Sequence, residues 1–291
     1  MLSAWRIPIL LVALAGFAVG CAISLRNLAL SSSAINLDPL FAIVLLLIPA
    51  SIAYGAINLM LMSHAAEVRI GFSHAVKVSV FSNVAEMLPL PGGAIVRAAA
   101  LIEAGSSKKL SAELVIAFSL LWIAVGGAGA GVVLIELGWP AIATLAASIA
   151  SALAICCWLT WRFNLIVAVT AAALRIVGVA LLALRLMLAF TVIGMGVAWF
   201  DSASFAFATI LGSAASIAPA GLGISEALSS LIAHLVDVAP AAAFLATALN
   251  RLLGLAVNIS AAVAYTMIDR LRGVGMLANR PVSAYTQDMD R

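Results

Sequence analysis

The segment Leu88-Pro89-Leu90-Pro91-Gly92-Gly93 interrupts an apolar stretch that runs from residue 72 to residue 105. A second interruption, Pro219-Ala220-Gly221-Leu222-Gly223, divides the stretch from 203 to 238. Proline blocks helix continuation and glycine weakens it, so both stretches are predicted to break near their middle. The pieces on either side have about 11 to 16 residues, which is too short for one helix to cross a bilayer.

Broken backbone at membrane depth survives only where protein or a wet cavity shelters it. We therefore expect each stretch to form a re-entrant pair of half-helices that enters and leaves the membrane on one side. The alternative is a kinked helix that crosses completely. A shift of 130 residues aligns the two breaks, since Pro89 then meets Pro219 and Gly93 meets Gly223. This spacing predicts an internal repeat, although so few matching positions also allow chance.

The composition excludes a soluble globular protein. Of the 291 residues, 65% are hydrophobic and only 9% are charged, whereas a soluble domain carries about 25% charged residues. The mean hydropathy is +1.21. We therefore expect an integral membrane protein without a soluble catalytic domain. The net charge of +3 is small and its basic residues form no stripe, so no nucleic-acid partner is expected.

Six unbroken apolar runs are long enough to span a bilayer. Their approximate ranges are Ile7–Leu25, Leu40–Met62, Leu110–Ile135, Ala141–Thr160, Val177–Phe200 and Pro240–Ile268. The first run follows Arg6 and also fits a signal peptide, but its length favours a transmembrane helix. Residues 163–176 are interpreted as an interfacial lead-in, with an extra span as the alternative. Four glycines in the third run are expected to permit close helix contact: Gly126, Gly127, Gly129 and Gly131.

The expected fold is therefore all-α, with about six transmembrane helices and two re-entrant half-helix hairpins. Three spans separate the hairpins, and because three is odd the repeats should have inverted topology. Residues 1–269 form one polytopic domain in this interpretation, with repeats at about 7–135 and 141–268. Residues 270–291 are expected to be a disordered cytoplasmic tail.

Basic residues are expected to gather on the cytoplasmic side of the membrane. The six-span topology places these basic residues on one side: Arg6, Arg69, Lys77, Lys108, Lys109, Arg162, Arg175, Arg270, Arg272, Arg280 and Arg291. The opposite side receives Arg26 together with four acidic residues: Asp38, Glu136, Asp201 and Asp237. This asymmetry places both termini in the cytoplasm. Arg185 is expected to extend toward the cytoplasmic interface.

Polar residues near the two breaks are the candidate site. A charged residue inside a membrane helix costs about 2.5–3.5 kcal/mol on insertion scales, so such residues are functional candidates. The candidates are Asn83, Glu86, Arg97, Glu226, Asn250 and Arg251, beside the break residues Pro89, Pro91, Gly92, Gly93, Pro219, Gly221 and Gly223. The first break has a half-helix N-terminus near an arginine, which fits a phosphate. The alternative is that these charges only pair with one another and hold the hairpins.

No catalytic residue, metal site or cofactor is expected. The three cysteines, Cys21, Cys156 and Cys157, lie in apolar runs without metal-binding spacing. The three histidines are scattered and form no HExxH motif. Ser225 lies in Gly-Ile-Ser-Glu-Ala, which is not the GxSxG pattern of a nucleophile elbow.

At the two breaks the sequence resembles the flippase-like transmembrane domain of bacterial lysylphosphatidylglycerol synthases. The matching residues are Asn83, Pro89, Gly93, Arg97 and Leu101, then Pro219, Gly221, Gly223, Glu226 and Arg251. The resemblance covers about Ile7 to Asp269 and implies a bacterial cytoplasmic (inner) membrane protein. The family often has an acidic residue where this chain has Ala94, Ile95 and Val96. The 291 residues lack the aminoacyl-transferring half, so the resemblance implies lipid handling without lipid synthesis.

Three functions are compatible with these features. The first, which the broken helices and the resemblance favour, is a flippase-like transporter that moves a lipid or lipid-linked head group between leaflets. The second is a non-transporting membrane partner of a lipid or envelope assembly enzyme. The third is an intramembrane enzyme that modifies a lipid, for which Ser225 would be the nucleophile. The lipid, the direction, the energy source and the oligomeric state do not follow from the sequence.

Overall fold

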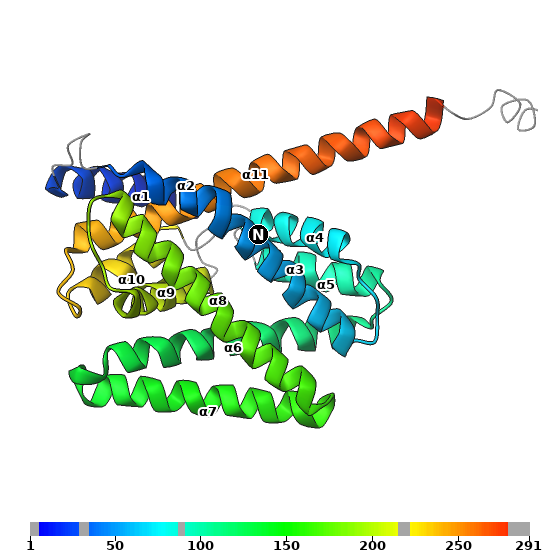
Figure 1. Cartoon of the computed structure of the whole chain (residues 1–291), viewed down its shortest axis with the longest axis horizontal. Helices are drawn as coiled ribbons and strands as arrows, with labels where there is room; N and C mark the ends of the chain where they lie inside the picture. The colour runs from blue at the N-terminus through cyan, green and yellow to red at the C-terminus, as the bar shows by residue number, and fades with distance from the viewer. Residues whose placement is uncertain (1–5, 29–34, 87–90, 215–221, 279–291) are drawn as a thin grey trace, which may run out of the picture.

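A computed structural model describes residues 6–28, 35–86, 91–214 and 222–278, with side chains from 15 to 271 within these ranges. Every element in these ranges is helical, as Figure 1 shows. The helices are α1 (Arg6–Leu28), α2 (Leu37–Ala42), α3 (Ile48–Ala65), α4 (Phe72–Ala85), α5 (Gly92–Glu103), α6 (Lys108–Val133), α7 (Trp139–Arg162), α8 (Leu165–Val192), α9 (Trp199–Ala214), α10 (Ile224–Ala233) and α11 (Pro240–Ala278). A π-helical turn, η2 (Ile43–Leu47), joins α2 to α3, and a 3-10 turn, η3 (Ile135–Leu137), precedes α7.

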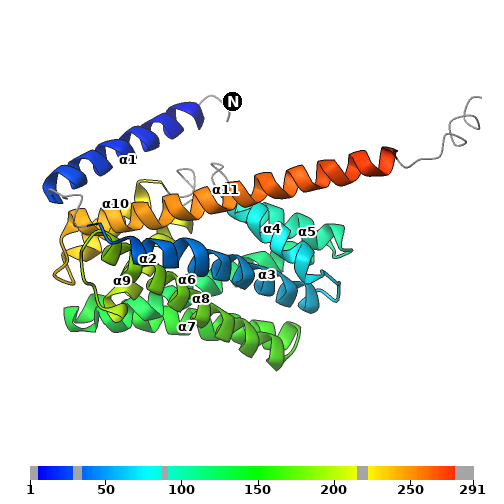
Figure 2. The same ribbon diagram turned by 45° about the horizontal axis from the view of Figure 1, so that its top comes forward.

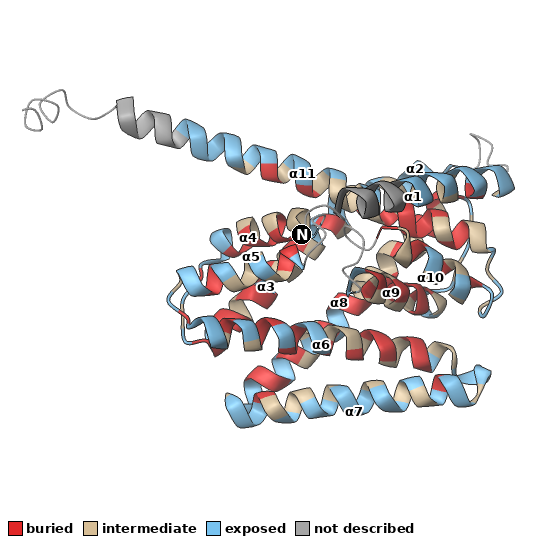
Figure 3. Ribbon diagram, turned by 180° about the vertical axis from the view of Figure 1, so that it is seen from behind, coloured by how far each residue is buried: buried red, intermediate tan, exposed pale blue. Residues whose placement is uncertain are grey.

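Five helical segments in the described chain are long and apolar enough to cross a membrane. They are Leu37–Ala65, Lys108–Val133, Trp139–Arg162, Leu165–Val192 and Pro240–Leu271. Their outer faces expose large apolar side chains, such as Trp161 at 83% and Ile166 at 75%. Figure 3 shows that α7 and the part of α11 that precedes its grey end are mostly exposed. Such a surface requires lipid, so the chain is a multi-pass membrane protein.

The helix α1 occupies the place of the first predicted span. It has 23 residues, and its described side chains from Ala15 to Leu28 form an apolar helix. Figure 2 shows α1 beside α11 and apart from the remaining helices. The rings of Phe17 in α1 and Phe244 in α11 lie 6.2 Å apart. Contact with α11 therefore holds α1 on the bundle.

The fifth predicted span begins too late in the sequence. Residues 165–176 belong to the same helix as residues 177–192, so they are neither an interfacial lead-in nor an extra span. The side chain of Asn164 accepts a hydrogen bond from the backbone N–H of Val167 at 2.8 Å, which caps α8 at this point. The helix stops at Val192, before Gly194 with a φ of 77°. The last helix extends beyond the predicted Ile268 to Ala278.

Both Pro/Gly-interrupted stretches consist of two short helices that pack against each other. The first pair is α4 and α5, with 14 and 12 residues, and the second is α9 and α10, with 16 and 10 residues. At 1.5 Å per residue none of the four reaches the roughly 30 Å of a hydrocarbon core. The predicted interruption of both stretches is therefore confirmed. Pro89, Pro219 and Gly221 lie outside the described residues.

Two hydrophobic clusters stabilise the helical bundle. One contains Val167, Ala168 and Ala171 from the first part of α8, and the other contains residues from Ala183 to Val192 at its end. The middle of α8 contributes Arg175, Gly178 and Arg185 to a cavity. The cavity therefore lies at the mid-length of a 28-residue helix that is about 42 Å long.

Candidate functional site: an arginine-lined central cavity

A cavity of about 540 Å³ lies inside the bundle. Seven helices contribute to its wall: α3, α4, α5, α6, α8, α9 and α11. Among the described residues, its lining includes four arginines, Arg97, Arg175, Arg185 and Arg251, and a single carboxylate, that of Glu86. This volume is within the roughly 300–1,000 Å³ of small-molecule sites, and polar groups set the specificity of such sites.

The structure brings most of the predicted polar residues together. Asn83, Glu86, Arg97, Asn250 and Arg251 all line this cavity, although they come from α4, α5 and α11 and their connections. The break residues Pro91 and Gly93 line it as well. Gly92 is buried where its Cα faces the carbonyl of Ala85, so the close approach leaves no room for a side chain.

Glu226 lies behind the cavity wall and compensates one of its arginines. Its Oε1 is 3.4 Å from Nε of Arg251, and the two side chains are 0% and 8% exposed. Its other oxygen accepts a hydrogen bond from the backbone N–H of Gly223 at 2.8 Å, which caps α10. Gly223 has a φ of 82°, a left-handed conformation that glycine adopts without strain. The second break thus places a carboxylate against Arg251.

A second ion pair joins the two helices of the first hairpin. Nη2 of Arg97 in α5 lies 3.1 Å from Oε1 of Glu86 at the end of α4, and both side chains are partly exposed. One turn earlier, Asn83 donates a hydrogen bond to Asn258 of α11 at 3.0 Å. These contacts hold the α4–α5 pair against α11 and support the interpretation that some of the charges stabilise the hairpins.

Arg175 is surrounded by aromatic side chains in the cavity wall. It donates hydrogen bonds to the hydroxyl of Tyr54 at 2.9 Å and to Oδ1 of Asn58 at 3.1 Å. Its guanidinium carbon is 5.4 Å from the ring centre of Phe118 and 5.6 Å from that of Trp122, both cation–π distances. The residue is only 8% exposed. The prediction that Arg175 faces the cytoplasm is therefore wrong.

The prediction that Arg185 extends to the interface is also wrong. Its guanidinium donates to Oγ of Ser51 at 3.2 Å and to the backbone carbonyl of Asn250 at 3.3 Å, inside the cavity. A Cβ added to Gly254 would lie 3.1 Å from its Nη2. The close approach of α11 at this glycine leaves the space in which the guanidinium lies. Packing between α3, α8 and α11 therefore directs Arg185 inward.

The paired and unpaired arginines give the cavity an excess of positive charge. Arg97 has Glu86 and Arg251 has Glu226 as ion-pair partners, whereas no described carboxylate lies within 4.0 Å of Arg175 or Arg185. Their partners are neutral oxygens. The site therefore has two uncompensated guanidinium groups at membrane depth, where an isolated charge is costly.

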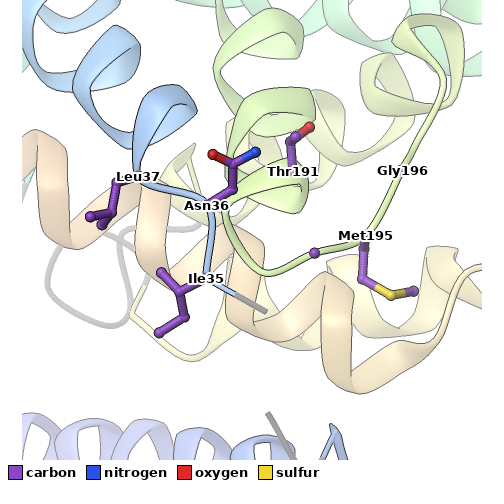
Figure 4. Close-up of a pocket in the computed structure, with 7 residues that line it drawn as sticks. Ile35, Asn36, Leu37, Thr191, Met195 and Gly196 are labelled. Atoms are coloured by element: carbon purple, nitrogen blue, oxygen red, sulfur yellow. The ribbon is translucent and has the colours of Figure 1, made fainter. Parts of the chain in front are cut away.

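A second hollow, shown in Figure 4, lies on the surface where α2 begins and α8 ends. Its lining has no ionisable side chain: Ile35, Asn36, Leu37, Thr191, Gly194, Met195 and Gly196. Oδ1 of Asn36 already accepts a hydrogen bond from the N–H of Asp38 at 3.3 Å and caps α2. The groups that could recognise a charged ligand are thus in the central cavity.

The chemistry around Ser225 differs from that of an activated nucleophile. Its Oγ accepts a hydrogen bond from Nη2 of Arg251 at 2.6 Å and lies 3.4 Å from the carbonyl of Thr209. His64, His74 and His234 are exposed on the surface. In the described part of the chain, no three His, Cys, Asp or Glu side chains gather as a metal site. The arrangement is suited to hydrogen bonding and charge compensation.

No protein-family model matches this sequence, and no curated protein matches it. The resemblance to the lysylphosphatidylglycerol synthase domain, which was inferred from short motifs at the two breaks, stays a prediction. The geometry of the cavity is therefore the basis for any functional proposal.

Replacing Tyr54 by phenylalanine should lower the free energy of unfolding by about 1–3 kcal/mol, because it leaves a buried Arg175 donor without a partner. The Tyr54 hydroxyl also accepts from Nδ2 of Asn58 at 3.2 Å. Thermal unfolding of the detergent-purified protein measures the effect. The control is Tyr265→Phe, because the Tyr265 hydroxyl makes no hydrogen bond among the described residues. Equal melting temperatures for both variants would contradict the role of Tyr54.

Proposed function

We propose that this protein moves a lipid or lipid-linked head group between the leaflets of a bacterial cytoplasmic membrane. The supporting observation is a polar cavity at the mid-length of apolar helices, bordered by the first interrupted pair, α4–α5, and by α9 of the second. Interrupted helices that line a mid-membrane cavity are typical of transporter binding sites. A head group can pass through such a cavity while its acyl tails stay in lipid.

The proposal includes two re-entrant hairpins, α4–α5 and α9–α10, in an inverted repeat. In this arrangement α7 corresponds to α1, α8 to α3, and α11 to α6. The helix contacts support it, because α6 packs on α7 and α9 just as α11 packs on α1 and α4. Likewise, α3 packs on α4 as α8 does on α9, and α5 packs on α6 as α10 does on α11.

Two contacts between distant segments support the six-span topology, and the excess of basic residues on one side then favours both termini in the cytoplasm. Lys77 near the start of α4 forms an ion pair with Asp269 in α11. The open end of the first hairpin and the end of the last apolar span therefore lie at the same face, as the six-span topology requires. At the opposite end of α8, the N–H of Asn36 donates to the carbonyl of Val192 at 3.0 Å. The start of α2 and the end of α8 thus share the other face.

Proteoliposomes with fluorescently labelled lipids test the function directly. A membrane-impermeant quencher removes only the label in the outer leaflet, so protein-dependent quenching of the remaining label reports leaflet exchange. We expect exchange with the wild-type protein and its loss in Arg97→Ala, because this change removes the cavity charge beside the first break. Exchange should persist in Arg162→Ala, since Arg162 is exposed at the end of α7.

The lipids in this assay should include anionic, zwitterionic and cationic head groups. Exchange at the wild-type rate in Arg97→Ala would show that the lipid head group does not pass through this cavity. If purified protein exchanges no lipid but co-purifies with a lipid-synthesising enzyme, the non-transporting partner replaces the transporter as the interpretation. Hydrolysis or modification of a lipid that disappears in Ser225→Ala would favour the intramembrane enzyme.

A further inference from the structure

The two cavity arginines without a carboxylate partner lie on one helix. Arg175 and Arg185 are ten residues apart in α8, and both line the central cavity. Their anchors are close together on α3, where Arg185 bonds to Ser51 and Arg175 bonds to Tyr54 and Asn58. Both guanidinium groups therefore contact α3 on its cavity side.

Each of these arginines has a buried Nε without a hydrogen-bond partner among the residues that the structure describes. The same is true of Nη1 of Arg251. Buried polar atoms in native proteins nearly always have a partner. Buried acceptors without a partner lie nearby as well, Oε1 of Glu226 and Oδ1 of Asn250, so the preference for an anionic ligand rests on the charge balance of the cavity.

The charge balance defines this ligand further. Neutral oxygens of Tyr54, Asn58, Ser51 and Asn250 fix the two guanidinium groups in place but cancel none of their charge. The ligand that such a site favours is therefore one that compensates both charges. A zwitterionic head group compensates neither in net terms, and a cationic head group adds to the excess.

We propose that the central cavity binds a phosphate group with two negative charges, a phosphate monoester or a diphosphate, with Arg175 and Arg185 as its anchoring residues. Phosphate oxygens accept the paired N–H groups that a guanidinium presents. Trp122 borders the site and packs against Arg175, which keeps that guanidinium in position. The lipid origin of the phosphate rests on the proposed function, whereas its recognition follows from the cavity alone.

Equilibrium binding to the detergent-purified protein tests this inference. Phosphatidic acid, phosphatidylglycerol and phosphatidylcholine with identical acyl chains are compared at a pH at which the monoester is doubly ionised. We expect phosphatidic acid to bind about 10-fold or more tightly than phosphatidylglycerol, from the loss of one charge-assisted contact, and phosphatidylcholine to bind most weakly. Equal affinities for the three lipids would overturn the proposal.

Single substitutions connect the preference to the two arginines. Arg175→Gln and Arg185→Gln should each lower the affinity for phosphatidic acid about 10- to 100-fold while changing that for phosphatidylglycerol less. Arg162→Gln, at the exposed end of α7, should change neither. If a glutamine variant does not fold, the corresponding lysine variant, which preserves the charge, is tested in its place. It should retain the preference for two charges with weaker binding. An unchanged preference in both glutamine variants would refute the assignment.

Inorganic pyrophosphate distinguishes the two sources of the phosphate. If it displaces phosphatidic acid at comparable concentration, the cavity recognises a soluble phosphate, and if it does not, the acyl chains are part of the ligand. The outcome is separate from that of the leaflet-exchange assay. Selective binding of phosphatidic acid without leaflet exchange would support the phosphate site and contradict the proposed transport function. Exchange of a zwitterionic lipid without selective phosphate binding would support the transport function and contradict the phosphate site.

Discussion

Glu226→Gln is expected to lower the free energy of unfolding by about 3–5 kcal/mol, because it leaves the Arg251 guanidinium as a buried charge without a counter-ion. The pair is almost inaccessible to solvent, at 0% and 8% exposure. Glutamine has nearly the same size and retains an oxygen that can accept the N–H of Gly223, so the cap of α10 is preserved. Unfolding in mixed micelles, monitored by tryptophan fluorescence, gives the free energy.

The double variant Glu226→Gln/Arg251→Gln separates the ion pair from local packing. Removing both charges should recover much of the lost stability, since no buried charge is left uncompensated. Glu113→Gln is the matched control, because Glu113 pairs with the exposed Lys109 at 3.9 Å and such pairs contribute about 0–1 kcal/mol. A Glu226→Gln protein as stable as the Glu113→Gln protein would show that the pair does not hold the second hairpin.

Much of the fold follows from patterns that the sequence displays directly. The apolar runs predict the spanning helices, because only about 20 apolar residues in a helix cross the hydrocarbon core. The interruption at Pro91 and Gly93 predicts the short helices α4 and α5 for an equally local reason. The polar residues near these breaks are predictable as cavity residues, because a charged side chain in an apolar run avoids lipid by facing the bundle interior.

Arg175 and Arg185 show what local patterns do not reveal. Asn164 starts α8 some twelve residues before the predicted span, and this shift moves Arg175 from the expected interface to the centre of the bundle. A basic residue within one or two turns of a helix end normally extends to the interface. Whether it turns inward depends on neutral partners such as Tyr54 and Ser51, which lie more than 100 residues away in sequence. Tertiary packing therefore determines the unpaired half of the site.

The two interpretations of the buried charges apply to different residues. Arg97 and Arg251 pair with carboxylates that the breaks place beside them, as expected of charges that hold the hairpins. Arg175 and Arg185 have no described carboxylate within 4.0 Å. The paired arginines therefore hold the hairpins in addition to lining the cavity, whereas the charges of Arg175 and Arg185 are left for a ligand to compensate.

Gly212→Ala should lower the free energy of unfolding by about 1–3 kcal/mol, because overpacking forces α9 away from α10. A Cβ on Gly212 would lie 2.6 Å from the backbone nitrogen of Ser225, which cannot move without its helix. The intrinsic preference of a helix for alanine, about 1 kcal/mol, acts in the opposite direction, so a net loss must come from the contact between the helices. Thermal unfolding in detergent measures the change.

Gly129→Ala is the control with the opposite expected sign. Gly129 lies within α6, and a Cβ there would meet only the Cβ of Ala203 at 3.9 Å, an ordinary contact. The helix preference should then dominate and stabilise the protein slightly. Displacement of α10 in Gly212→Ala also moves Ser225, whose hydroxyl holds Arg251, so ligand binding should weaken together with stability. If both alanine variants gain stability, close packing of α9 against α10 at Gly212 is not required for the α9–α10 hairpin.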